Sequence, residues 1–152
     1  MTRTEVRDSI FRIVFREAFF QPESMEEQAE NYIKALEQEP RTFLPGMKKE
    51  IEPEDEEYIR TKSMAILNKT SELDALLESA SHDWKMNRVG KAELAILRVA
   101  AYEIRFDDDI PGKVAVNEAL ELAKKYCDEK AVSFINGVLN QLLIKPEDSD
   151  KE

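Results

Sequence analysis

The side chains that could do chemistry are few, and their spacing favours binding over catalysis. His82 and Cys127 are the single histidine and the single cysteine, and they lie too far apart in sequence to suggest a nucleophile and its base. The carboxylates of residues 54–57 could bind a metal ion, but such a run at a helix start is usually a solvated face that the helix dipole stabilises. The sequence contains no glycine-rich phosphate loop and no cysteine pair for zinc. We therefore predict a non-enzymatic protein without a metal ion or a cofactor.

Four arginines within the first twenty residues are candidates for contact with nucleic acid. Arg3 and Arg7 are four residues apart and share one face of the expected helix, and Arg12 and Arg16 share a face on roughly the opposite side. Each pair could straddle phosphates. The alternative is that these arginines form surface ion pairs with the three carboxylates of the same segment. Of the four, Arg7 is the preferred phosphate contact.

The charge is unevenly distributed along the chain. The net charge is -10, which at first argues against nucleic acid because phosphates are bound mainly by Lys and Arg. Residues 21–83 hold 7 basic and 16 acidic residues, however, whereas residues 84–143 hold 9 of each, and residues 1–20 hold 4 basic and 3 acidic residues. The first helix and the carboxy-terminal half can therefore face phosphates.

Length and composition define the class of protein. A chain of 152 residues, 42% hydrophobic and 36% charged, suits one soluble globular domain. No apolar run approaches the ~20 residues of a membrane span, and the amino terminus is charged where a signal peptide is apolar. We expect a cytoplasmic protein.

The elements that must position these side chains are helices, because the chain has only 4 glycines and is rich in helix-forming residues. Apolar spacing and helix stops predict an all-α bundle of six to seven helices. The expected helices cover residues 4–20, 24–38, 53 to about 70, a following helix through residue 77, and then 91–106, 114–126 and 132–144.

The helix over residues 91–106 is apolar nearly all round, so we expect it to be the central, most buried one. Gly90 can serve as its N-cap, with Glu93 in the third position. We predict two packed three-helix subdomains within a single domain spanning residues 1–152. Their ranges are 1–82 and 83–145, followed by a polar tail over 146–152.

Several segments at fixed spacing resemble the NusB family of bacterial transcription antitermination factors. The residues that carry the resemblance are Trp84, Arg88, the run from Ala95 to Glu103, the run from Val116 to Lys125, and Phe134-Ile-Asn-Gly137. The resemblance implies an all-helical fold in two parts, in agreement with the apolar pattern. The resemblance is close over residues 84–143 and weak before residue 84.

By resemblance, Phe134 lies near the RNA path and Lys130 occupies a loop position near RNA, while Phe15 and Glu93 meet a protein partner. Stacking of a base on a ring is worth ~1 to 3 kcal/mol, although the sequence by itself favours Phe134 as a core residue of the last helix. For Glu93, stabilisation of the first helical turn is an equal alternative. The family commonly has more arginines at its amino terminus. Here less basic residues, Thr2 among them, occupy some of those positions.

The remaining signature residues, Asn117, Glu118, Asn136 and Gly137, are expected to be structural. Asn136 is placed to hydrogen-bond across helices, and Gly137 is expected to permit close helix approach. They identify the fold more than a site.

The resemblance implies a non-enzymatic RNA-binding factor. With a small-subunit ribosomal protein in the NusE role, it would bind boxA-like single-stranded RNA in an RNA polymerase antitermination complex, including on ribosomal RNA transcripts. The alternative is a helical protein-interaction module or homodimer with weak or no RNA binding. A salt-sensitive RNA complex distinguishes the two hypotheses.

Overall fold

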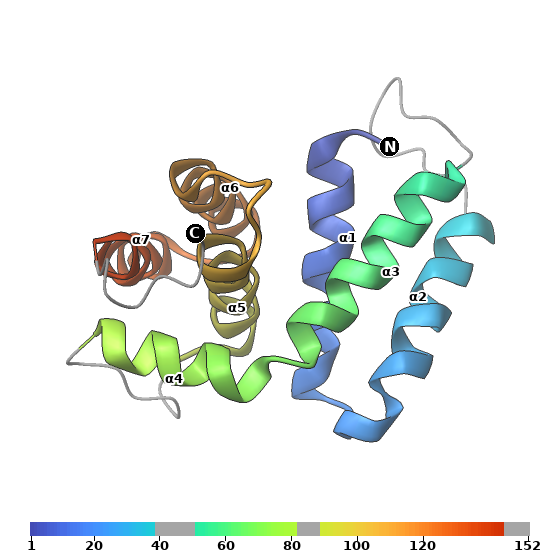
Figure 1. Ribbon diagram of the computed structural model, residues 1–152, viewed down its shortest axis with the longest axis horizontal. Coiled ribbons are helices and arrows are strands. Elements are labelled where there is room, and N and C mark those ends of the chain that lie inside the picture. The colour runs from blue at the N-terminus through green and yellow to red at the C-terminus, as the bar shows by residue number, and fades with distance from the viewer. Residues whose placement is uncertain (39–50, 82–88, 145–152) are drawn as a thin grey trace. The chain divides into compact units, whose positions relative to one another are not determined.

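The computed structural model describes residues 1–38, 51–81 and 89–144, and all regular structure within these ranges is helical (Figure 1). Seven α-helices and two short 3₁₀ turns are present there, with no strand. The all-α prediction is confirmed. In the same ranges, no helix combines the length and the apolar character needed to cross a membrane. The helices form two compact units that divide between Asn68 and Lys69.

The first unit contains three α-helices, α1 (Arg3–Phe15), α2 (Met25–Gln38) and α3 (Pro53–Leu67). Both α1 and α2 pack against α3, as Figure 1 shows. Apolar side chains from all three helices form the core: Ile10, Ile13, Val14, Met25, Ala29, Ile33, Ile59 and Ile66 are at most 2% exposed.

The starts of these helices follow local rules, but the end of α1 does not follow the apolar pattern. The Thr2 hydroxyl oxygen accepts a hydrogen bond from the Glu5 amide at 3.1 Å and caps α1. Pro53 opens α3 at its first position, as predicted. The predicted helix over 4–20 is too long, because α1 ends at Phe15 and passes into a 3₁₀ turn, η1 (Arg16–Ala18).

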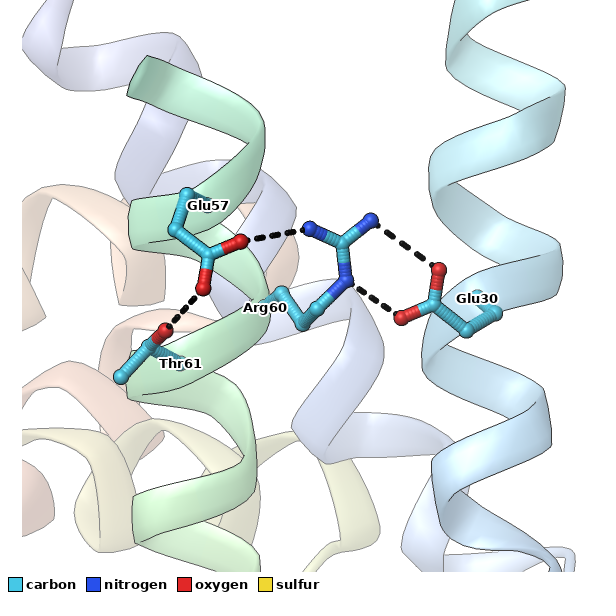
Figure 2. Close-up of polar contacts among 4 residues, drawn as sticks. All are labelled: Glu30, Glu57, Arg60 and Thr61. Carbon is cyan, nitrogen blue, oxygen red and sulfur yellow. Dashed lines mark hydrogen bonds and ion pairs between the residues drawn. The ribbon is translucent and has the colours of Figure 1, made fainter. Parts of the chain in front are cut away.

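A polar cluster joins α2 to α3 (Figure 2). The Arg60 guanidinium donates to both carboxylate oxygens of Glu30, with Nη2 3.0 Å from Oε1, and also to Glu57 at 2.9 Å. The Thr61 hydroxyl donates to the other Glu57 oxygen at 3.1 Å. The hydrogen bond from Arg60 lowers the pKa of Glu30 below its usual value. Part of the acidity of this segment is therefore balanced locally.

The second unit contains α4 (Thr70–Ala80), α5 (Lys91–Phe106), α6 (Gly112–Tyr126) and α7 (Glu129–Leu143). Helix α5 contacts the other three and buries residues on all sides. Helix α5 is thus the central helix of the second unit, in agreement with the prediction. Its bounds match the predicted range. Gly90 stands at its N-cap position, as expected.

The position of α4 differs from the predicted subdivision. Leu73 and Leu77 of α4 are fully buried, and the helix packs against α5 and α7, so it belongs with the second unit. The predicted boundary at residues 82–83 lies outside the described residues. So do His82, Trp84, Arg88 and the tail over 146–152.

Candidate nucleic-acid and protein interfaces

The first turns of α1 present two of the predicted cations. The Thr2 cap fixes the start of the helix, and the Arg3 side chain one residue later is exposed. Arg7 follows one turn on and is half-buried. Because residues four apart lie on one helix face, the two guanidinium groups can serve the same ligand.

Arg12 and Arg16 are held by neighbouring side chains. Arg12 Nε donates to Asp8 at 2.9 Å, the surface ion pair that the sequence left open as an alternative. Arg16 Nη1 donates to the side-chain oxygen of Gln28 at 2.9 Å, and its guanidinium lies 5.4 Å from the ring centroid of Tyr32. Arg16 thus joins the end of α1 to α2.

Phe15 stands in a row of aromatic rings that leads to solvent. Its ring stacks on Phe11 with centroids 5.8 Å apart and meets Phe19 edge-on at 5.2 Å. Phe11 is buried and Phe15 half-buried, whereas Phe19 and Phe20 are 58% and 43% exposed. Sequence reasoning named Phe15 and missed the two exposed rings, although adjacent phenylalanines just before a helix-stopping proline were a visible signal. These rings enlarge the apolar surface around Phe15.

Glu93 lies in the first turn of α5 with its side chain folded back over the N-cap. Its Oε1 atom lies only 3.0 Å from the position that a Cβ at Gly90 would take. Burial, and then the negative charges of Glu93 and Asp128, raise the pKa of the Cys127 thiol. Cys127 and Asp128 form the turn between α6 and α7, and the charge of Glu93 acts on this turn.

The same turn leads directly to the predicted RNA residues. Asp128 caps α7 by accepting a hydrogen bond from the Ala131 amide at 2.8 Å, so the helix begins at Glu129 and not at the predicted residue 132. Lys130 consequently lies in the first turn of α7 and not in a loop, and it is exposed. Phe134 is half-buried one turn further on. Within the second unit, Glu93 thus comes from α5, and Lys130 and Phe134 come from α7, which packs against α5.

Two expectations about the signature residues are wrong. Asn136 is exposed, and its side-chain and backbone oxygens accept hydrogen bonds from Asn140 at 2.8 Å on the same helix, not on another one. Gly137 is also exposed, and a Cβ there would meet no atom of residues 1–38, 51–81 or 89–144 within 4 Å, so no close approach of a described helix requires it. On α6, Asn117 is exposed and Glu118 is half-buried.

These features define a class of protein built for binding. Cations and partly exposed aromatic rings occur in both units, Arg3, Arg7 and Phe15 in the first and Lys130 and Phe134 in the second. In the part of the chain that the structure describes, no group of three or more His, Cys, Asp or Glu side chains could hold a metal ion. Each unit therefore offers cations and partly exposed rings as candidate binding groups.

Comparison with known proteins identifies the family. The NusB family model matches residues 4–143. The transcription antitermination protein NusB of Lachnoclostridium phytofermentans is 44% identical, with 94% of this chain and 99% of that protein covered. Its counterpart from Agathobacter rectalis is 43% identical over 91% of this chain and 97% of its own length. The chain belongs to the NusB family of transcription antitermination proteins, which is non-enzymatic.

Solved structures show the same fold. NusB of T. maritima superposes with a TM-score of 0.78 and 26% identity, covering 95% of this chain and 92% of that one. A structure of the antitermination factors NusB and NusE with double-stranded RNA gives a TM-score of 0.73 at 23% identity, over 94% of this chain and 98% of that chain. The second likeness concerns the fold alone.

Proposed function

We propose that this antitermination factor acts as an RNA-binding adaptor in the cytoplasm. With a small-subunit ribosomal protein in the NusE role, it binds boxA-like single-stranded RNA and helps to hold an antitermination complex on RNA polymerase, including on ribosomal RNA transcripts. The observation that carries this proposal is the family match over residues 4–143, which spans every residue assigned to binding except Arg3.

Charge and aromatic surface support the RNA part of the proposal. Arg3 is exposed at the start of α1 and Arg7 is half-buried one turn on, while Lys130 is exposed in the first turn of α7. Phosphate neutralisation by such side chains supplies most non-specific affinity. The half-buried ring of Phe134 can stack on one base, a contact worth ~1 to 3 kcal/mol.

The aromatic row and Glu93 support the protein part. Phe15 and the exposed ring of Phe19 offer an apolar docking surface, and Glu93 offers a negative charge. Ribosomal proteins are generally basic, so the acidity of this chain steers such a partner toward it. A solved complex pairs another NusB with NusE and RNA, and we extend that partnership to this chain.

The mechanism is shared binding. Each surface on its own makes a few contacts and holds its ligand weakly. When the RNA contacts both proteins at once, the second contact becomes intramolecular and its effective concentration rises. Affinity therefore depends on the ternary complex more than on one tight site.

The test is fluorescence anisotropy of a labelled boxA-like single-stranded RNA, with and without the ribosomal protein, at two salt concentrations. We expect partner-enhanced binding that exceeds binding of a scrambled RNA. Arg7→Gln should weaken it and reduce the salt slope by ~0.7, the value for one phosphate contact on a single strand. Arg12→Gln is the matched control, because it removes one charge from the same helix at a position roughly opposite Arg7, and it should leave the slope unchanged.

The exposed rings of Phe19 and Phe20 favour a second candidate, a protein-interaction module or homodimer without useful RNA binding. In that case the ribosomal protein, or a second copy of the chain, would bind while RNA would not. Sedimentation equilibrium of the chain alone measures self-association, and the anisotropy experiment measures RNA binding. A dimer that binds neither RNA sequence would contradict the adaptor proposal.

A further inference from the structure

Gly137 has no explanation within the described chain. It lies inside α7, an interior where glycine is the least favourable residue after proline. Its backbone is not in the left-handed region, and a Cβ would meet nothing within 4 Å. Gly112 is different, because a Cβ there would lie 2.5 Å from Leu143 Cδ2. A glycine in a helix without a packing or conformational reason leaves room for an external ligand to approach the backbone closely.

Gly137 lies on the same face of α7 as both predicted RNA residues of this unit. Lys130, Phe134, Gly137 and Gln141 follow at spacings of four, three and four residues, which places them along one stripe of the helix. Lys130 and Gln141 are exposed, and Phe134 is half-buried. From Lys130 to Gly137 the helix rises about 10 Å. A short single-stranded segment can contact all three residues.

The charge of this stripe favours RNA over a basic protein. Residues 130–144 contain one lysine and no carboxylate, in a chain with 32 acidic residues. A basic protein would find opposite charge on α7 only at Glu129 and at the N-cap Asp128, whereas a phosphate backbone that crosses the helix beyond Lys130 meets no carboxylate of that helix. Asn136 and Asn140, beside the stripe, carry exposed amide groups that can donate and accept hydrogen bonds.

We propose that Gly137 is the point where single-stranded RNA comes closest to α7. The missing side chain leaves room for the ribose next to Phe134, on which a base stacks, while Lys130 contacts a phosphate. This inference rests on the proposed RNA-binding function and adds a residue to its site. It also gives Gly137 a binding role in place of the structural one that the sequence suggested.

The test compares Gly137→Ala and Gly137→Leu with the wild-type chain, by urea denaturation and by anisotropy of boxA-like RNA with the ribosomal protein present. The urea midpoint of Gly137→Ala should rise, because alanine favours the helix and fills open space. RNA affinity should fall, and for Gly137→Leu by about tenfold, equivalent to ~1.4 kcal/mol. Ala75→Leu is the matched control, since it adds a similar side chain to an exposed position on another helix of the same unit, α4.

The outcomes separate this inference from the function on which it rests. If wild-type protein binds no RNA, both the proposed function and this inference fail. If wild-type protein binds RNA and Gly137→Leu binds it equally well, only the inference fails. A Gly137→Leu variant that loses the ribosomal protein in a binary assay would assign the stripe to protein and overturn the RNA assignment. A lower urea midpoint for Gly137→Ala would show that the position is not open.

Discussion

The ion pair between Arg98 and Asp74 allows a sharp prediction about stability. Arg98 on α5 donates from Nε and Nη2 to the two Asp74 carboxylate oxygens on α4, both at 2.9 Å. The side chains are only 13% and 20% exposed. Replacing Arg98 with alanine leaves a largely buried carboxylate without this partner, so we expect a substantial loss of folding free energy.

The magnitude follows from the burial and geometry of the pair. Exposed pairs contribute about 0.2–1 kcal/mol, and breaking a fully buried pair costs about 3–5 kcal/mol. A two-bond fork at this intermediate exposure should lie between those ranges, at about 2 kcal/mol. The pair of Arg12 and Asp8 has the same residue types, but Arg12 is 47% exposed and both residues lie on one helix. Its expected contribution is about 0.3–0.5 kcal/mol.

Urea denaturation of two double-mutant cycles measures both contributions. Each cycle combines Arg→Ala and Asp→Ala singly and together, so that losses unrelated to the pair cancel. The coupling energy of Arg98 with Asp74 should exceed that of Arg12 with Asp8 by at least ~1 kcal/mol. Equal coupling energies would refute the reasoning, because burial and the two-bond geometry would then have no effect.

Two further predictions concern pH and packing. Burial, together with a hydrogen bond to Glu37 and its charge, raises the pKa of Glu56. The folded state therefore binds the proton of the Glu56 carboxyl group more tightly than the unfolded state does. The free energy of unfolding falls as pH rises through the raised pKa. Glu56→Gln should remove that fall and stabilise the protein at pH 7 by about 0.2–1 kcal/mol, as urea titrations across acidic pH would show. Gly112→Ala should change stability by no more than ~0.5 kcal/mol, because the atom that meets the new methyl group is the end of the half-buried Leu143 side chain, which can turn away, and thermal denaturation measures the change.

The helices were predictable where local signals mark both ends. The range 91–106 was predicted to the residue because Gly90 precedes it and a run of aspartates follows. The end of α1 was not predictable in this way. Apolar residues continue to Phe20, but Arg16 turns to bind Gln28 and Tyr32 on α2, a tertiary contact that local spacing does not encode. The start of α7 was missed although Asp128, a favourable N-cap, was visible.

The sequence suggested candidate binding residues, but it did not predict which of them the neighbouring helices cover. Sequence alone suggested Arg7, Lys130 and Phe134, and their roles stay predictions. It assigned Gly137 to the interior because a small residue inside a helix usually permits close packing. Which face of a helix is covered depends on the neighbouring helices, and none of the described helices covers Gly137.

Local composition, more than net charge, decides whether this chain can face RNA. At physiological ionic strength charges separated by more than about 8 Å are largely screened. The net charge of -10 therefore repels a phosphate only where carboxylates lie close to it. In the first unit Arg60 binds both Glu30 and Glu57, which reduces the local field of that acidic segment. On α7 the carboxylates are confined to its start, at Asp128 and Glu129, and none follows Lys130. An acidic chain can thus keep a stripe suited to RNA while the rest of its charge steers a basic partner.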